Sequence, residues 1–330
     1  MKTIFPIGTR GSPLALAQAR ETQNRLAQAM GLQAVDLQAV DLQVMDLQVM
    51  DLGEQTREHV LPLRIITTTG DTILDRALSE SGGKGLFTKE IDAAQLNGEI
   101  AIAVHSAKDL PTHLPEGLII AGYWPREDAR DALISLDNIP FLSLKSGATI
   151  GTASLRRQAM LLRQRPDLKI ELLRGNVGTR IQKIKSGALS ATLLAIAGLN
   201  RLGLHNVISE KLETNHFLPA VGQGAIALVI REHDIATREL LSPLLCAQTQ
   251  YALAAERAFL TTLDGSCRTP LAGHAVIIKD EIHFKGMVFS TDGAQAFEIE
   301  QRGSIEDAQS IGHDAGLAIK SRAKPFLDWL

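Results

Sequence analysis

Two neighbouring stretches, Thr149-Ile-Gly-Thr-Ala-Ser-Leu-Arg-Arg157 and Lys169-Ile-Glu-Leu-Leu-Arg-Gly-Asn-Val-Gly-Thr-Arg180, decide the fold class of this chain. Each begins with a short apolar run typical of a strand and passes through small polar residues into a helical segment. A strand followed directly by a helix, repeated along a chain, indicates a parallel or mixed sheet covered by helices. The two stretches therefore predict an α/β protein.

The same alternation extends on both sides of these stretches. Ser12 is a favourable helix N-cap and Pro13 a favourable first helical residue, so a helix is expected from there to about Ala29. Further strands are expected at Thr3–Gly8, Leu61–Thr68, Glu99–Val104, Leu118–Gly122, Ala132–Ser135, Ala191–Ala195 and Ala225–Arg231.

The pattern changes after about Ala247. A helix is expected at Tyr251–Leu263, then strands at Leu271–Ile278, Glu281–Ser290 and Gln295–Arg302, and a closing helix at Ile305–Arg322. Lys279-Asp280 and Thr291-Asp292-Gly293 supply the turns between these strands. Consecutive strands joined by short turns pair antiparallel, so this part predicts a smaller α+β domain with a three-stranded antiparallel sheet.

One segment departs from this plan. Leu32–Asp51 consists of two copies of LQAVD followed by two copies of LQVMD. A period of five matches neither a helix nor a strand. We interpret it as an insert between the first helix and the second strand, poorly ordered or loosely helical, and assign it no function. The alternative is that it extends the first helix as a packed element.

Composition narrows the classes of protein to consider. The chain has 330 residues, net charge −3, 4% aromatic residues and two cysteines, Cys246 and Cys267. Near-neutral charge and few aromatics argue against a nucleic-acid binder. No apolar run is long enough for a membrane span, and no signal peptide is visible, so we expect a cytoplasmic protein without a disulfide framework. No residue spacing suggests a metal site.

The unusual polar groups recur where predicted strands end. They are Thr9–Ser12, Thr69–Asp71, His105–Asp109, Thr152–Arg157 and Arg174–Asn176. Open α/β sheets bind ligands at the carboxyl ends of their strands, and helix N-termini there favour anions. Between Gly151 and Lys185 there are nine Lys and Arg but only two acids. The sequence therefore predicts a cleft for a small polyanion.

Structural interpretations of single residues remain open at this point. One arginine near a helix start is more often a surface residue, and His105 more often packs than catalyses. Asp109, beside Lys108, fits an ordinary ion pair as well as a catalytic carboxylate. Cys246 is expected to be buried and inert. Cys267 follows Gly-Ser and precedes Arg268, so it is a candidate for thiolate character and modification.

Eight strings spread over nearly the whole chain carry a resemblance to a known family. They are Ile7–Leu16, Gly82–Glu90, Ala103–Pro111, Arg126–Ala132, Gly151–Gln158, Leu173–Arg180, Pro219–Ala225 and Gly265–Pro270. In this order they resemble the porphobilinogen deaminase (hydroxymethylbilane synthase) family. The resemblance implies head-to-tail condensation of four porphobilinogen molecules to hydroxymethylbilane with release of ammonia, in tetrapyrrole (porphyrin and heme) biosynthesis. The resemblance further implies that the growing pyrrole chain starts from a dipyrromethane cofactor, which is joined to Cys267 by a thioether.

The resemblance also implies roles for single residues. Asp109 matches the catalytic aspartate, which would stabilise positive charge as ammonia leaves and as the terminal pyrrole attacks. The positions that match cofactor-carboxylate binders are Ser106, Lys108, Ser154, Arg156, Arg157 and Arg180. Those that match residues around the incoming substrate are Arg10, Ser12, Arg174, Arg201 and Gln223.

The domain plan implied by the resemblance has two lobes like those of a two-lobed binding protein, with mixed sheets flanked by helices. The first would comprise 1–124 and 225–243, the second 128–220, and a C-terminal domain carrying the cofactor cysteine 248–330. We expect a monomer that passes its product to the next enzyme. The five-residue repeat is foreign to the family pattern, and Glu80 stands where some relatives carry a second lysine.

Two other classes of protein compete with the enzyme. A two-lobed solute-binding protein without catalysis would share the fold but leave Cys267 and Asp109 unexplained. An RNA- or phosphate-binding module would use the basic stretch from Gly151 to Lys185 and leave the other strand ends unexplained. A covalent two-pyrrole adduct on Cys267 would separate the enzyme from both.

Overall fold

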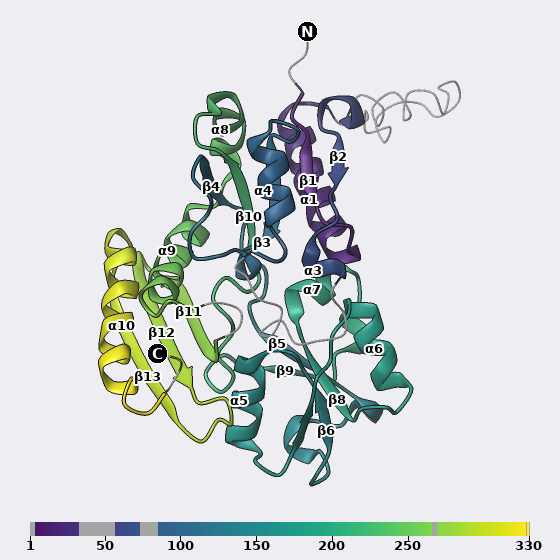
Figure 1. Cartoon of the computed structure of the whole chain (residues 1–330), viewed down its shortest axis with the longest axis vertical. Helices are drawn as coiled ribbons and strands as arrows, with labels where there is room; N and C mark the ends of the chain where they lie inside the picture. Colours follow the sequence, from purple (N-terminus) through teal and green to yellow (C-terminus); the bar gives the residue numbers. More distant parts are fainter. Residues whose placement is uncertain (1–3, 33–56, 73–84, 266–268, 328, 330) are drawn as a thin grey trace.

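The computed structural model describes residues 4–32, 57–72, 85–265, 269–327 and 329, arranged around three β-sheets (Figure 1). Two five-stranded mixed sheets, each flanked by helices, form two lobes that lie one above the other in Figure 1. A three-stranded antiparallel sheet with two helices lies beside them. The predicted fold class, two mixed α/β lobes and a C-terminal α+β domain, is confirmed.

The first-lobe sheet has the strand order β2-β1-β3-β10-β4. The strands are β1 (Ile7–Thr9), β2 (Leu63–Ile65), β3 (Ile102–Ser106), β4 (Leu118–Tyr123) and β10 (Ile226–Arg231). β1 pairs parallel with β2 and β3, whereas β10 lies between β3 and β4 and is antiparallel to both. Because the second lobe intervenes before β10, this sheet is assembled from two separate stretches of the chain.

Helices cover this sheet, and the first of them begins where the sequence indicates. They are α1 (Pro13–Ala29), α3 (Thr69–Thr72), α4 (Lys89–Leu96) and α8 (Ile235–Leu241). Ser12 caps α1 by accepting a hydrogen bond from the Ala15 amide at 3.3 Å. None of the helices in the described residues is long and apolar enough to cross a membrane.

Helix α1 ends before the five-residue repeat begins. Gly31 has a left-handed φ of 64°, and the Leu32 amide donates back to the Ala27 carbonyl at 2.8 Å. This is the usual way in which a glycine terminates a helix. The repeat from residue 33 onward lies outside the described residues.

The second-lobe sheet repeats the plan of the first. Its order is β7-β6-β8-β5-β9, and its strands are β5 (Asp131–Ser135), β6 (Thr149–Gly151), β7 (Lys169–Glu171), β8 (Ala191–Ala195) and β9 (Glu210–Leu212). β6 pairs parallel with β7 and β8, and β5 is antiparallel to β8 and β9. Helices α5 (Leu155–Gln164), α6 (Val177–Lys185) and α7 (Ile196–Arg201) follow β6, β7 and β8. Only β9 was not predicted among the strands described in this lobe.

The third domain consists of α9 (Ala247–Thr262), β11 (Leu271–Ile278), β12 (Glu281–Phe289), β13 (Ala296–Ser304) and α10 (Ala308–Ala323). The three strands pair antiparallel in sequence order. Lys279 and Asp280 both have left-handed φ, 49° and 65°, as the tight turn between β11 and β12 requires.

Apolar cores join the third domain to both lobes. One core runs from Val229 of the first lobe to Phe259 of α9. Another runs from Met160 of the second lobe to Phe289 of β12. The third domain is therefore packed against both lobes, as its place beside them in Figure 1 shows.

A buried carboxylate reinforces this junction. Glu256 of α9 is fully buried and accepts from the Arg126 guanidinium at 2.5 and 3.2 Å. It also accepts from the backbone amides of Gly222 at 2.7 Å and Ala275 at 2.8 Å. Arg126 and Gly222 lie in the two segments, 124–130 and 213–225, by which the chain passes between the lobes. Glu256 thus fastens both crossing segments to the third domain.

Gly293 allows a turn of the third domain to approach α5. It has φ 73°, and a Cβ there would lie 2.2 Å from the Ala159 carbonyl oxygen, whereas Gly147 has φ 74° and open space. We expect Gly147→Ala to lower the free energy of unfolding by about 1–2 kcal/mol, the cost of left-handed backbone. Gly293→Ala should cost more, because the turn must also leave α5. Chemical denaturation measures both, and equal losses would contradict this account of the contact.

Candidate active site

Residues of both lobes meet in a chain of hydrogen bonds at the lobe boundary. Lys108, in the short 3-10 turn Ala107–Asp109 after β3, donates to the Gln223 side-chain carbonyl at 3.4 Å. The buried Gln223 amide donates to Asp131 at the start of β5, at 3.1 Å. Lys108 and Gln223, both predicted binding residues, are thereby joined to the second lobe.

Asp131 is the centre of this cluster. Its fully buried carboxylate accepts from Arg156 at 2.6 Å and from Arg157 at 2.6 and 3.1 Å. Arg156 also donates to the Leu218 carbonyl at 2.7 Å, and Arg157 to the Leu193 carbonyl at 2.8 Å. Both arginines are therefore held in one position at the start of α5.

The electrostatics of the cluster leave it positively charged. Burial alone would raise the pKa of Asp131, but the charges and hydrogen bonds of Arg156 and Arg157 outweigh burial and hold that pKa well below its usual range. Burial lowers the pKa of Lys108 to about 8, and the charge of Arg157 acts in the same direction. One ionised aspartate therefore faces three cationic side chains.

The charge of Asp109 acts on cations of both lobes. Burial, together with the charges of Arg157 and Arg174, lowers the pKa of Arg180 to about 10, and the charge of Asp109 opposes this shift. Asp109 acts in the same sense on Lys108. Arg180 is oriented by donating its Nε to the Gly175 carbonyl at 2.9 Å. The predicted catalytic carboxylate and four predicted anion binders therefore lie within electrostatic reach of one another.

A cavity of about 60 Å³ adjoins Asp109 on the first-lobe side. Arg10, Ser12 and Ser106 line it, as predicted site residues should, together with Gln18 and Phe87. Gln18 donates to the Ser106 hydroxyl at 2.9 Å, and the Arg10 guanidinium carbon lies 4.2 Å from the centre of the Phe87 ring. The cavity therefore combines an aromatic wall with polar groups on the ends of β1 and β3.

Two further titratable residues, Asp71 and His105, lie near Arg10 and have structural explanations. Asp71, in the predicted strand-end loop, forms a close ion pair with Arg10. His105 is buried, and burial together with the charge of Arg10 lowers its pKa to about 4. An uncharged, buried imidazole favours the packing interpretation of His105.

Arg201 lies apart from the Asp131 cluster, whereas Ser154 adjoins it through the backbone of Arg157. Arg201 ends α7 and donates its Nε to Glu21 of α1 at 3.1 Å and its Nη2 to the Gly224 carbonyl at 3.3 Å. None of its described hydrogen bonds reaches Asp131 or Asp109. Ser154 caps α5 by accepting from the Arg157 amide at 3.4 Å.

Several features were missed or misjudged from the sequence. Asp131 was not proposed as a site residue, although a charge directly before the apolar run Ala132–Ser135 needs a buried partner. Cys246 is half-buried at the N-terminus of α9, not buried as expected, because it precedes the first helical turn. Cys267, Lys84 and Glu80 lie outside the described residues.

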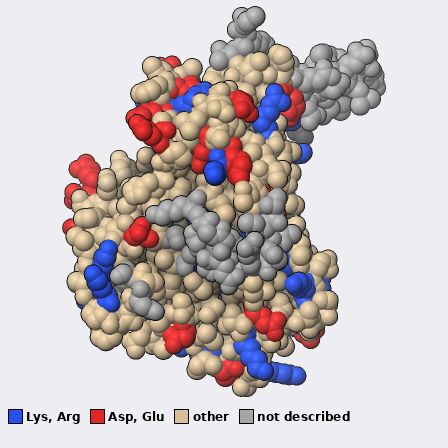
Figure 2. Space-filling view, viewed as in Figure 1, with Lys and Arg blue, Asp and Glu red and all other residues tan. Residues whose placement is uncertain are grey.

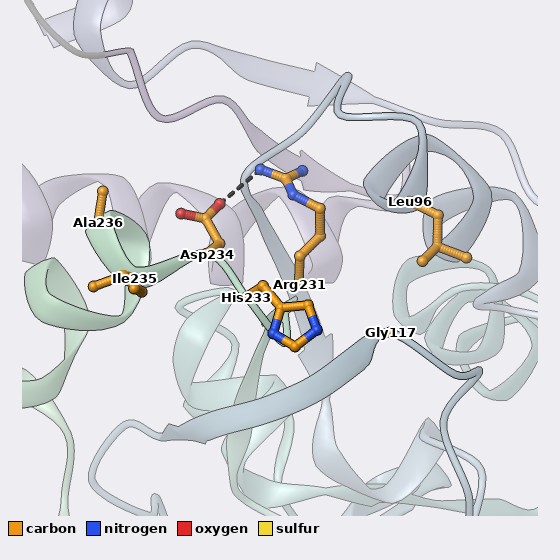
Figure 3. A pocket seen from close by; sticks show the side chains of 7 residues that line it. All are labelled: Leu96, Gly117, Arg231, His233, Asp234, Ile235 and Ala236. Atoms are coloured by element: carbon orange, nitrogen blue, oxygen red, sulfur yellow. Dashed lines mark hydrogen bonds and ion pairs between the residues drawn. The ribbon is translucent and has the colours of Figure 1, made fainter.

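A second hollow, about 520 Å³ in volume, lies elsewhere on the first lobe (Figure 3). Leu96 of α4 lies on one side, and Ile235 and Ala236 of α8 lie on the other. The Arg231 guanidinium beside it is occupied by Asp234 at 2.6 Å and by two backbone carbonyls. None of the predicted site residues lines this hollow.

The donors at the lobe boundary fit a group bearing several carboxylates. Arg156, Arg157, Arg180 and Lys108 outnumber the carboxylates among them, and the Nε of Arg156 is buried without a partner in the described residues. Guanidinium groups bind carboxylates strongly without losing their proton. On the face in Figure 2, by contrast, Lys and Arg are interspersed with Asp and Glu. On this one face the two signs of charge are mixed, whereas the groups named at the lobe boundary are mostly positive.

Among the described residues no group of three or more His, Cys, Asp and Glu side chains is placed to hold a metal ion.

The fold and this cluster define a two-lobed α/β protein with a cationic site for a small polyanion. Residues 5–239 match the family model "Porphobilinogen deaminase, dipyromethane cofactor binding domain", and residues 250–321 match "Porphobilinogen deaminase, C-terminal domain". The chain belongs to the porphobilinogen deaminase family.

Curated relatives agree with this assignment. The porphobilinogen deaminase of Nitrobacter hamburgensis is 48% identical over 317 residues, covering 96% of this chain and 93% of the relative. That of Nitrobacter winogradskyi has the same identity and coverage. Among solved structures, the Bordetella pertussis BvgS periplasmic VFT2 domain is similar over 77% of this chain and 92% of that one, with 14% identity and a TM-score of 0.40. That likeness is too weak to bear on the family assignment.

Family membership confirms the activity and cofactor expected from the sequence. The chain is a transferase of tetrapyrrole biosynthesis, a hydroxymethylbilane synthase, with a dipyrromethane cofactor. The alternative of a non-catalytic two-lobed binding protein is not favoured.

Asp131→Asn would leave two buried guanidinium groups without their counter-charge. We expect it to lower the free energy of unfolding at neutral pH by about 3–5 kcal/mol. Asp128→Asn, which breaks a partly exposed ion pair with Arg130, should cost less, about 1 kcal/mol. Urea denaturation followed by circular dichroism measures both losses, and equal losses would exclude a special role for Asp131.

The effect of Asp131 should also depend on pH. Its folded-state pKa lies below its ordinary value of 3.8, so its contribution is complete above that value and is lost as the pH falls below it. The stability difference between wild type and Asp131→Asn should therefore shrink in acid.

Proposed function

We propose that this enzyme carries out chain extension at the lobe boundary, with Asp109 as its catalytic carboxylate. The observation that carries the proposal is that the charge of Asp109 acts on both Lys108 of its own lobe and Arg180 of the other, while Asp109 also lines the cavity beside Arg10. A negative group fixed among cations suits a reaction in which anionic side chains must be held while positive charge develops on a ring. Asp109 would stabilise that charge as ammonia leaves and accept the proton released after ring attack.

We assign the cofactor's carboxylates to one set of donors. These are Ser106, Lys108, Ser154, Arg156, Arg157 and Arg180, and the cofactor would be held by a thioether to Cys267. When bound, the cofactor supplies the pyrrole end to which new rings are added. This assignment is supported by the way Arg156 and Arg157 are held by Asp131 and by backbone carbonyls. Because the two side chains are already ordered, little conformational entropy is lost when they bind a ligand.

We assign the incoming porphobilinogen to Arg10, Ser12, Arg174, Arg201 and Gln223. Arg10 and Ser12 line the cavity beside Asp109, and the charge of Arg174 acts on Arg180. Gln223 is buried and links Lys108 to Asp131, so it would support the binding groups by holding them in place.

We further propose the division into a first lobe of 1–124 with 225–243, a second lobe of 128–220, and a cofactor-bearing domain of 248–330. Hinges would lie near 123–127 and 219–224, and lobe motion would accommodate the growing chain. We also propose a monomer that works in the cytoplasm and passes hydroxymethylbilane to the next enzyme, as the family resemblance implies.

Intact-mass spectrometry of the holoenzyme tests the covalent part of this proposal. We expect the mass of the chain plus two pyrrole rings, and peptide mapping should place the addition on the fragment that contains Cys267. Incubation with substrate should add further single-ring increments. Active enzyme with an unmodified Cys267 would overturn the assignment.

Asp109→Asn and Asp109→Ala test the catalytic part. We expect turnover to fall by about 10²–10³ or more, because the charge aimed at the developing cation is lost. Asp314→Asn, on an exposed position of α10, is the matched control and should leave turnover unchanged. Steady-state assays at equal holoenzyme content measure the rates, and near wild-type turnover in Asp109→Asn would rule out this role.

A further inference from the structure

Glu21 lies on α1 of the first lobe between two arginines, one from each lobe. Its Oε2 accepts from the Nε of Arg201 in the second lobe at 3.1 Å. Its Oε1 accepts from the Nε and Nη2 of Arg25 at 3.2 and 3.0 Å. The Arg201 side chain is only 10% exposed, and that of Glu21 is 28% exposed. The contact between Glu21 and Arg201 therefore crosses the lobe boundary in a largely enclosed place.

Both partners of Glu21 are anchored in turn. The Arg25 guanidinium lies 5.4 Å from the ring of the fully buried Trp124. The Nη2 of Arg201 donates to the Gly224 carbonyl at 3.3 Å. Trp124 and Gly224 lie in the two segments by which the chain passes between the lobes. An isolated surface pair must order two mobile side chains for little gain, but here both are already held.

The contacts of Arg201 with Glu21 and Gly224 fix the plane of the Arg201 guanidinium group. Arginine presents five N–H donors in a rigid fork, and Glu21 and Gly224 each take one donor of Arg201. With Nε and Nη2 held, the remaining N–H groups of Arg201 point in one set of directions. Glu21 approaches no other residue of the second lobe in the described hydrogen bonds.

We propose that Glu21 is a positioning residue for substrate binding. By holding the Nε of Arg201, Glu21 presents the remaining guanidinium donors to a carboxylate of porphobilinogen. This inference rests on the proposed role of Arg201 and assigns a function to a residue that binds no substrate itself.

Two physical effects oppose each other when Glu21 is neutralised. Loss of the anchor lets Arg201 sample other rotamers, which weakens carboxylate binding. Loss of a negative charge makes the cleft more positive, which strengthens the binding of anions. The anchor acts by direct contact, whereas the charge effect acts over a distance and is screened by salt. The proposal therefore requires that variants in which Glu21 is neutralised bind porphobilinogen more weakly than the wild type.

The first test compares KM with kcat in the holoenzyme. We expect Glu21→Ala to raise KM for porphobilinogen about tenfold, the value of one charge-assisted hydrogen bond, and Glu21→Gln to raise it less. The kcat should stay within about twofold, because Asp109 and its partners are untouched. Glu239→Gln removes the same charge from an exposed position on α8 and should leave KM unchanged.

A double-mutant cycle shows whether Glu21 acts through Arg201. Arg201→Gln alone should raise KM, and adding Glu21→Gln to it should change KM no further. Thermal unfolding of each variant separates a loss of stability from a loss of affinity.

The outcomes distinguish the inference from the function on which it rests. A fall in KM for Glu21→Gln, additive effects in the cycle, or a lower Tm with unchanged KM would overturn the positioning role alone, provided that Arg201→Gln raises KM. An Arg201→Gln enzyme with unchanged KM would overturn the assignment of Arg201 itself.

Discussion

The contact of Asp131 with Arg156 and Arg157 is the interaction on which the site depends. A carboxylate with no solvent exposure is tolerated only because two guanidinium groups and the Gln223 amide satisfy it. In return it fixes both arginines, and through Gln223 it fixes Lys108 of the other lobe. The positions of these cations are therefore set by the protein itself, through bonds that cross from one lobe to the other.

A second buried carboxylate limits how the lobes can move. Glu256 binds Arg126 and Gly222, one from each crossing segment, and also the backbone of β11. The third domain shares an apolar core with each lobe. Any rotation of one lobe against the other must therefore pivot close to Glu256 or slide one of these cores. A two-lobed protein without a third domain has no such restraint.

Local patterns predicted the elements well, because strands and helices here depend on short-range signals. Thr149–Gly151 and Ala191–Ala195 coincide with β6 and β8, and Ser12-Pro13 marks the start of α1. β9 was missed because Glu-Lys-Leu has no apolar run and is a strand only through its pairing with β5. In the structure the loops after β1 and β3 line one cavity, and the loop after β6 carries Arg156 and Arg157 to Asp131.

The internal counter-charges could not be predicted in the same way. Asp131 forms an ion pair with Arg156, and Glu21 forms one with Arg201. In both pairs the partners are far apart in the sequence, and no local sequence pattern indicates that they meet. The resemblance to a family suggested which arginines bind ligand, but not that two of them already share a buried aspartate. Long-range electrostatic pairing is set by the tertiary fold, which single-sequence patterns do not encode.

The position of β10 has a consequence for the order in which the molecule is built. While the chain is being synthesised, β3 and β4 have no neighbour between them until Ile226–Arg231 has left the ribosome. Their unpaired edges are the kind of surface that associates with other chains. All five strands of the second lobe, by contrast, lie within one uninterrupted stretch and can pair earlier. The second lobe is therefore completed first in the nascent chain, and the lobe that begins at the N-terminus closes only afterwards.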